Sequence, residues 1–291
     1  MEPTTYERAI LDPKWQEALA VELHALQQNH TWTLTPLPSD HHPIGCKWVY
    51  KIKHNSNGII EWYKALLVAK GFTQCEGIDY KETFSPMAKL TTIWCLLVVV
   101  VVRHWSLHQM NVQNAFLHGD FLEEVYMQLP PSFHRQEETP MVCWLNKSLY
   151  GLKQASRSWF QKFYTTIQQD GFHQSRVDYS LFTKIFGNSF TDVLIYVDDI
   201  IITDNYENVI AALKKSLHTK FRIKDLVQLR YFLSIEIARS TYGISISQQK
   251  YTLDILDEAG LLGAKPLSTP MEENNKLLYK FSKVQFLFFP I

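Results

Sequence analysis

The sequence predicts an α+β protein in which helices and antiparallel hairpins follow one another without a regular β-α-β repeat. Two segments, residues 12–29 and 153–169, repeat apolar side chains at helical spacing. A third segment, residues 180–203, contains three consecutive runs of β-branched and aromatic residues. With 291 residues, 46% of them hydrophobic, the chain can bury a substantial core as one large or two ordinary domains.

The first third of the chain predicts a helix, a hairpin and an apolar segment. Asp12 suits the N-cap and Pro13 the first turn of a helix over residues 12–29. Its buried stripe would be Trp15, Ala18, Leu19, Leu23 and Leu26. Residues 46–72 are typical of two strands joined at Asn57-Gly58, a dipeptide that favours tight hairpins. The apolar run 93–102 predicts a buried helix or a buried strand, and it is too short to cross a bilayer.

The rest of the chain predicts two short strands, at 107–116 and 124–129, before the second helix. That helix, over 153–169, would turn Trp159, Phe160, Phe163 and Ile167 inward and stop before Gly171. The elements expected after it are strands at 180–186, 190–197 and 198–203, a helix at 206–220, a hairpin at 231–247 and a helix at 249–260. The tail, residues 277–291, has no partner in this pattern, so we expect a non-native or poorly packed end.

The charge balance limits how the chain can bind a polyanion. Lys and Arg total 29 and Asp and Glu total 29, so any nucleic-acid site must be local. Two basic stretches, residues 46–74 and 141–169, could line such a site or could be ordinary solvated surface. The four cysteines form no closely spaced pair and the N-terminus has no secretory signal, so we expect a reducing, intracellular environment without membrane association.

The segment LIYVDDIIIT, residues 194–203, places two adjacent carboxylates, Asp198 and Asp199, between two apolar strands. A tight hairpin would put them at its tip, where carboxylate oxygens can hold a hard divalent cation such as Mg²⁺. Polymerases use such ions to activate a primer hydroxyl and to stabilise the departing pyrophosphate. The alternative is an ordinary turn, because aspartate is also a common turn former.

Further segments, in a matching order along the chain, connect this motif with a family. They include PIGCKWVYKIK, YKALLVAKGFTQ, NAFLHGDF, SLYGLKQASRSWF and KYTLDILDEAGLL. Over residues 12–276 they resemble the reverse transcriptase domain of copia-type LTR retrotransposon Pol polyproteins.

The resemblance implies a right-hand polymerase with an antiparallel palm sheet. Such an enzyme extends a primer on an RNA or DNA template, using deoxynucleoside triphosphates (dNTPs) and Mg²⁺ or Mn²⁺. The implied parts are a helical lead-in at 1–30, fingers at 31–92 with a hairpin at 46–70, a palm at 93–227, and a primer-grip hairpin with the start of the thumb at 228–276. Other products of the same polyprotein are implied as partners, in cytoplasmic particles or in the nucleus.

The resemblance also implies roles for individual residues. Asp198 and Asp199 would hold the metal ions, and Phe116 would stack under the sugar and exclude a 2′-hydroxyl. The other nucleotide-binding residues would be Lys64, Lys153 and Gln154. The primer and template contacts would come from Tyr196, Arg157, Phe232 and Leu233.

Several positions depart from the family pattern. Asn111 stands where the pattern has a third metal-binding aspartate, so we expect weak metal binding and little or no polymerase activity. Asp120, on a nearby loop, is a poor substitute. Leu66 stands where an arginine is expected to face the triphosphate. The remaining departures are Trp94 for arginine, Ser156 for proline, and Val227 and Ser234 at glycine positions, where glycine often signals a close backbone approach or a positive φ.

Two alternatives to an active enzyme follow from these departures. The first is a non-catalytic relic that keeps the fold and binds nucleic acid through its basic stretches. The second is a remnant that neither folds stably nor binds anything.

Overall fold

The computed structural model describes residues 2–54, 59–121, 123–131, 133, 141–240 and 243–265. The chain divides into two compact units, Met1–Arg230 with Arg239–Ile244, and Tyr231–Ala238 with Ser245–Ile291. Helices are mixed with antiparallel sheets in a mostly non-repeating order, which confirms the predicted α+β class. The proposed tail at 277–291 lies outside the described residues.

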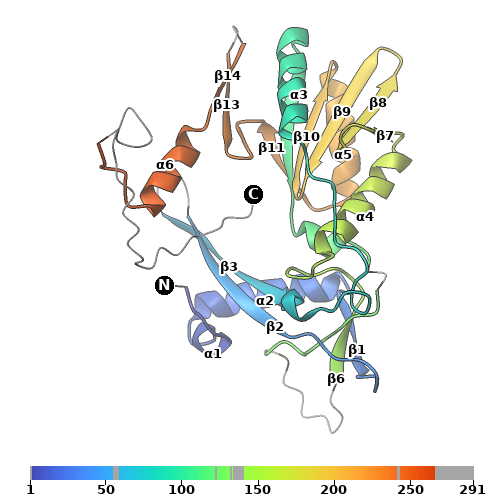
Figure 1. The fold of residues 1–291 in the computed structure, drawn as a ribbon, viewed down its shortest axis with the longest axis vertical. Coiled ribbons are helices and arrows are strands. Elements are labelled where there is room, and N and C mark those ends of the chain that lie inside the picture. Colours follow the sequence, from blue (N-terminus) through green and yellow to red (C-terminus); the bar gives the residue numbers. More distant parts are fainter. Residues whose placement is uncertain are drawn as a thin grey trace, which may run out of the picture. The chain divides into compact units, whose positions relative to one another are not determined.

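The N-terminal helices support a two-stranded sheet (Figure 1). After α1 (Tyr6–Ala9), α2 (Pro13–Gln28) begins as predicted, because the Asp12 carboxylate accepts a hydrogen bond from the Lys14 backbone N–H at 2.9 Å. Strands β2 (Cys46–His54) and β3 (Ile60–Ala69) pair antiparallel, and α2 packs on β3. The predicted turn at Asn57-Gly58 lies outside the described residues.

A second small sheet adjoins this hairpin, with strand order β1-β6-β5. It is formed by β1 (Trp32–Pro36), β5 (Tyr126–Met127) and β6 (Met141–Leu145). Of these strands only the region of β5 was predicted. One hydrophobic cluster joins both sheets to α2, and its members include Trp15, Leu26, Trp48, Leu67 and Leu145. Two short 3₁₀ helices, η1 (Gly71–Thr73) and η2 (Ala115–His118), lie in the connections.

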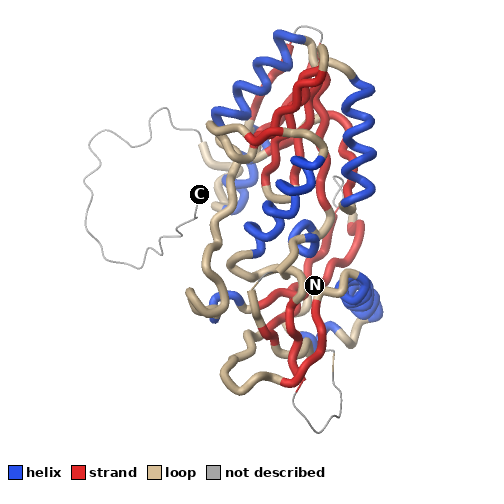
Figure 2. The backbone as a smooth tube through the Cα atoms, turned by 90° about the vertical axis from the view of Figure 1, so that its right-hand side faces the viewer, coloured by secondary structure: helices blue, strands red, loops and turns tan. Residues whose placement is uncertain are grey.

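The largest sheet has six antiparallel strands in the order β11-β4-β10-β9-β8-β7. Its strands are β4 (Ser106–Val112), β7 (His173–Gln174), β8 (Leu181–Phe186), β9 (Ser189–Tyr196), β10 (Asp199–Asp204) and β11 (Ile223–Gln228). Figure 2 shows helices on both sides of these strands. The strands predicted between 180 and 203 are confirmed, whereas β11 was not predicted.

Two helices share the second hydrophobic cluster with one face of this sheet. These are α4 (Ala155–Gln169) and α5 (Glu207–Lys220), both close to their predicted bounds. Helix α4 connects the two clusters, because Ala155 packs in the first and Trp159 in the second. The segment before α4 needs glycine: Gly151 has a φ of 88°, and an added Cβ would lie 2.2 Å from the Ala69 carbonyl oxygen.

The apolar run at 93–102 lies in a helix, α3 (Leu90–Arg103). The expectation that it is buried is correct for one face only. Ile93, Leu96, Leu97 and Val100 are buried, but Leu90, Trp94, Val98 and Val102 are exposed, because the run is apolar around the whole helix and only one side meets the protein. No helix in the described part of the chain has the length and apolar character that crossing a membrane would need.

Strand β11 contains a bulge at which the backbone turns left-handed. The pairing with β4 shifts register between Asp225 and Gln228, and Val227 between them has a φ of 65°. Bulges of this kind favour glycine, because a Cβ at positive φ meets the backbone. Of the two reasons that the sequence offered for glycine at these positions, close backbone approach or positive φ, the structure shows positive φ at Val227 and at Ser234, where φ is 64°.

The second unit contains a small sheet and a helix. Its strands are β12 (Tyr231–Phe232), β13 (Ile235–Ser240) and β14 (Gly243–Ser247), in the order β12-β13-β14, with β13 and β14 extending into the first unit. The turn between β12 and β13 consists of Leu233 and Ser234, which both have positive φ. Helix α6 (Gln249–Glu258) follows and buries none of its residues.

We predict that Val227→Gly raises the free energy of unfolding by about 0.5–1 kcal/mol, measured by urea unfolding. The gain arises because glycine adopts a φ of 65° without a Cβ clash, and the half-exposed valine loses little burial. The matched control is Leu226→Gly, at a neighbouring position without a positive φ, which should lower stability. Equal losses in both variants would show that Val227 is not strained.

Candidate active site

The two adjacent aspartates lie at the tip of the β9-β10 hairpin, as predicted. Tyr196 and Asp199 are the last paired residues, and Val197 and Asp198 form the turn. Val197 has a φ of 53°, which is unfavourable for a β-branched side chain. Two hydrogen bonds hold this turn: the Trp159 indole N–H donates to the Val197 carbonyl at 2.6 Å, and the Val112 N–H donates to the Asp198 carbonyl at 2.7 Å.

Asn111 lies directly opposite Asp199, because β4 and β10 pair in that register. Its side-chain Nδ2 donates to an Asp198 carboxylate oxygen at 2.9 Å and to an Asp199 carboxylate oxygen at 3.3 Å. Gln109, two residues earlier on the same face of β4, donates to the same Asp199 oxygen at 3.3 Å. Position 111 therefore meets the aspartate pair, as the sequence led us to expect.

The amide of Asn111 changes the electrostatics of the pair. Burial, and then the charge of Asp198, raise the pKa of Asp199, while the hydrogen bonds from Asn111 and Gln109 act in the opposite direction. Both N–H groups of one amide are used by the two carboxylates. The carboxylates thus have donors within the protein, and their mutual repulsion is reduced without a cation.

The oxygen atoms of Asp198, Asp199 and Asn111 fit the needs of one hard divalent cation only in part. Among the described residues, no group of three or more His, Cys, Asp or Glu side chains is arranged to hold a metal ion. Asp198 and Asp199 supply carboxylate oxygens, and Mg²⁺ is commonly bound by one or two carboxylates together with phosphate oxygens and water. Asn111 could add an oxygen only if its amide turned over, and it would bring no charge.

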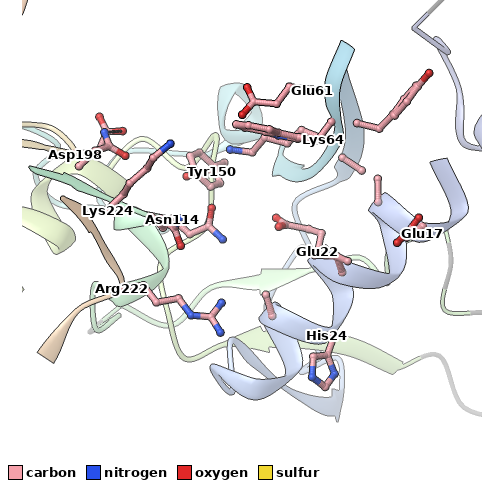
Figure 3. A pocket seen from close by; sticks show the side chains of 18 of the residues that line it. Glu17, Glu22, His24, Glu61, Lys64, Asn114, Tyr150, Asp198, Arg222 and Lys224 are labelled. Carbon is pink, nitrogen blue, oxygen red and sulfur yellow. Dashed lines mark hydrogen bonds between the residues drawn. The ribbon is translucent and has the colours of Figure 1, made fainter. Parts of the chain in front are cut away.

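A cleft of about 1000 Å³, lined by Asp198 but not by Asp199, opens between α2, β3 and the ends of β4 and β11 (Figure 3). Its charged lining residues are Lys14, Lys64, Arg222 and Lys224, balanced by Glu17, Glu22, Glu61 and Asp198. The cleft is therefore not uniformly positive. A strand of nucleic acid in it would meet cations and carboxylates in equal number, so specific contacts would matter more than net charge.

Three of the residues named from the resemblance lie near this cleft or the hairpin tip. Lys64 lines the cleft. Phe116, in η2, is half-buried and packs edge-on against the Tyr150 ring, with centroids 5.1 Å apart. Tyr196 ends β9 beside the aspartates. Tyr150, which lines the cleft from the segment before α4, was not singled out from the sequence.

Lys153, Gln154 and Arg157 do not line the cleft, and their side chains bond within the protein. Gln154 is 1% exposed; its side-chain N–H donates to the Asp79 carbonyl at 2.9 Å. The Lys153 ammonium donates to the Gln74 carbonyl at 3.2 Å, and Arg157 pairs with Glu82. These contacts fix the segment before α3 to the start of α4, so the proposed nucleotide and template contacts of the three residues stay predictions.

Two other expectations concern residues away from the pair. Asp120 is held by Lys147 and by Lys162, the latter at 2.7 Å, and it does not line the cleft, so it is not placed to replace Asn111. Phe232 and Leu233 lie on the β12-β13 hairpin of the second unit, and their primer contacts also stay predictions.

Glu22 is a cleft residue that the sequence pattern did not reveal. It lies on α2 within the buried stripe, is 6% exposed, and its Oε1 has no hydrogen-bond partner in the described structure. Burial raises the pKa of Glu22 to about 6, although the Leu67 backbone amide and the Lys64 charge favour the ionised form. The helical spacing of Trp15, Leu19 and Leu26 places position 22 on the buried stripe, and a glutamate at that position was the signal that the sequence offered.

Residues 29–273 match the family model described as reverse transcriptase (RNA-dependent DNA polymerase). The chain is 43% identical over 97% of its length to the retrovirus-related Pol polyprotein from transposon RE1 of Arabidopsis thaliana, and 44% over 95% to that from transposon RE2. It is 38% identical over 96% of its length to the Pol polyprotein from transposon TNT 1-94 of Nicotiana tabacum. The chain spans 19% to 22% of the length of these relatives.

We predict that Asn111→Asp lowers the free energy of unfolding by about 2–3 kcal/mol in metal-free buffer, because it removes two charge-assisted hydrogen bonds and adds a like charge. Mg²⁺ should raise the thermal midpoint of this variant more than that of the parent. The control is Asn114→Asp, which adds a charge to the same cleft. Equal responses of both variants to Mg²⁺ would contradict the arrangement.

We predict that Glu22→Gln stabilises the protein above pH 6 and has little effect below pH 4.5. The folded pKa of Glu22 is about 6 against an ordinary 4.5, so the parent is most stable relative to the variant when the carboxyl is protonated, and loses that stability as pH rises. The difference should reach about 2 kcal/mol at high pH. Chemical unfolding across pH 4–8 measures it, with exposed Glu17→Gln as the control. A pH-independent difference would refute it.

Proposed function

The chain belongs to the reverse transcriptase (RNA-dependent DNA polymerase) family and matches the reverse transcriptase domain of copia-type retrotransposon Pol polyproteins, and we propose that the Asp198–Asp199 pair is an impaired polymerase active site. The observation that carries the proposal is the hydrogen-bonded contact of Asn111 with both aspartates. Three positions that the family pattern assigns to metal binding come together, one on β4, one in the hairpin turn and one at the start of β10, and the first of them is an amide.

We propose the right-hand arrangement for the parts around this site. The six-stranded sheet would be the palm, residues 31–92 with the β2-β3 hairpin the fingers, and residues 228–276 the primer grip and start of the thumb. The position of the aspartates at a hairpin tip beside a cleft supports the assignment of the palm. The fingers and thumb assignments follow from the family pattern.

In this proposal Asp198 and Asp199 hold Mg²⁺ or Mn²⁺, which would activate the primer hydroxyl and stabilise the pyrophosphate leaving group. Phe116, fixed by its edge-on contact with Tyr150, would form the floor of the sugar pocket. Lys64 on the cleft wall would contact the phosphates of the incoming nucleotide. The substrates would be dNTPs and a primed RNA or DNA template.

Two substitutions reduce the activity that this arrangement can support. Asn111 gives a metal no charge and already bonds to both carboxylates, so an ion must break those bonds to bind. Leu66, on β3 two residues after Lys64, offers no donor to a triphosphate. Loss of one preorganised electrostatic group costs on the order of 10² to 10³ in rate, and loss of both should cost more.

The second candidate function is a non-catalytic relic. It is favoured by the aspartate pair, whose carboxylates accept hydrogen bonds from Asn111. A site that is balanced without a metal can persist in a folded protein that no longer catalyses. The residues Val227 and Ser234, held at positive φ, fit a chain in which functional glycines have been lost. Such a relic would still bind nucleic acid in the cleft, and other polyprotein products in a cytoplasmic particle or in the nucleus would be its partners.

We predict weak, Mg²⁺- or Mn²⁺-dependent primer extension on an RNA template by the parent chain, which Asp198→Asn abolishes. Asn111→Asp together with Leu66→Arg should raise extension by on the order of 10²-fold, because it restores a metal ligand and a phosphate donor. Asn114→Asp with Leu66→Arg is the matched control and should give a much smaller gain. A parent as active as the restored variant would contradict the impairment, and no extension by any variant would contradict the polymerase assignment.

A further inference from the structure

Glu22 is a buried carboxylate that the fold itself does not use. Its neighbours along the α2 stripe, Trp15, Ala18, Leu19 and Leu26, are apolar core residues, and a leucine at position 22 would continue the pattern. The side chain is 6% exposed and its Oε1 has no partner in the described part of the chain. Buried polar atoms are almost always hydrogen-bonded, so an unpartnered carboxylate oxygen is an uncommon feature with a substantial cost.

The protein around Glu22 offers it little compensation. Lys64 favours the charged form through its electrostatic field, and the Leu67 backbone N–H, from the same strand, does so as a hydrogen-bond donor. These interactions do not offset burial, which is the larger effect on the pKa of Glu22. One donor from outside the protein would complete the site, because a carboxylate has two oxygens and accepts several hydrogen bonds.

Glu22 belongs to the wall of the cleft that contains Asp198. Figure 3 shows its side chain reaching from α2 toward the side of the cleft where Lys64 and Tyr150 lie. Burial raises the pKa of Tyr150 most, and the charges of Glu22 and Asp198 raise it further, so the phenol lies within electrostatic reach of both carboxylates. This wall of the cleft therefore contains two polar groups beside the proposed reaction site. The Glu22 carboxylate is a hydrogen-bond acceptor, and the Tyr150 phenol remains protonated.

We propose that Glu22 is a further substrate-contacting residue, whose carboxylate accepts a hydrogen bond from an uncharged N–H or O–H donor of the nucleic acid bound in the cleft. This inference rests on the proposed function, because it requires a template strand or nucleotide in the cleft. The donor is either a ribose 2′-hydroxyl or the amine of a base, both of which proteins read through acceptor side chains. A phosphate is excluded as the contacting group, because it would be repelled by the carboxylate.

The test compares the binding of fluorescently labelled primer–templates by fluorescence anisotropy, with the full chain, on RNA and DNA templates of the same sequence. Glu22→Gln keeps the shape of the side chain but leaves only one acceptor oxygen. That oxygen would accept the hydrogen bond from the Leu67 N–H, so the amide NH₂ group would face the donor of the ligand and repel it. We expect a dissociation constant roughly tenfold or more above that of the parent. Glu17→Gln, which removes an exposed charge from the same helix and the same cleft, should bind as tightly as the parent or more tightly.

Each outcome has a defined meaning. A loss confined to the RNA template identifies the 2′-hydroxyl as the donor, and an equal loss on both templates identifies a base amine. Unchanged or tighter binding by Glu22→Gln overturns the inference and leaves the proposed function intact, because Glu22 would then act only as a repelling charge. Failure of the parent to bind either template overturns both. Thermal unfolding of the Glu22→Gln variant separates a binding defect from misfolding.

Discussion

The site depends on the register between β4 and β10, which sets Asn111 opposite Asp199. Side chains alternate between the faces of a strand, so a slip of one residue would bring Met110 from the hydrophobic core to the aspartates and bury Asn111. The register is fixed outside the site as well as within it. Met110 and Ile200 pack in the core, and the Trp159 indole ties α4 to the hairpin turn. The geometry of the cluster is thus a consequence of core packing, and it persists whether or not the cluster is functional.

Because core packing fixes the geometry of the cluster, the fold can accommodate the change proposed at position 111. Three carboxylates in contact would repel one another and would need cations to offset the cost. An amide at position 111 replaces that requirement with hydrogen bonds to both aspartates. With asparagine at this position the cluster is stable without a metal. The repulsion between carboxylates that would favour the binding of a cation is smaller. If the proposed active site is correct, stability and catalysis are opposed at this one position.

The sequence predicted the parts of the fold that local patterns encode. The α2 cap, α4 and the β9-β10 hairpin each have a continuous signal, and the family pattern marked Val227 and Ser234, which have positive φ, as positions that favour glycine. Strands β1 and β6 were missed because each is five residues long and is paired only by distant sequence. The burial of Gln154 and Glu22 was also missed, because a polar side chain in a helical pattern is normally read as exposed. The burial of Gln154 depends on distant neighbours, which no local pattern contains, whereas the helical spacing does place position 22 on the buried stripe of α2.

Asn111 and Glu22 are opposite cases of how a side chain's charge affects stability. At position 111 a neutral group stands among carboxylates, and the local electrostatic cost is low. At position 22 a carboxylate stands among core residues with an unpartnered oxygen, although a neutral side chain would be more stable there. Loss of function removes the reason to retain a costly charge. The proposed contact with nucleic acid would offset the cost of the Glu22 charge when a template is bound, and it would not depend on metal binding at Asp198 and Asp199.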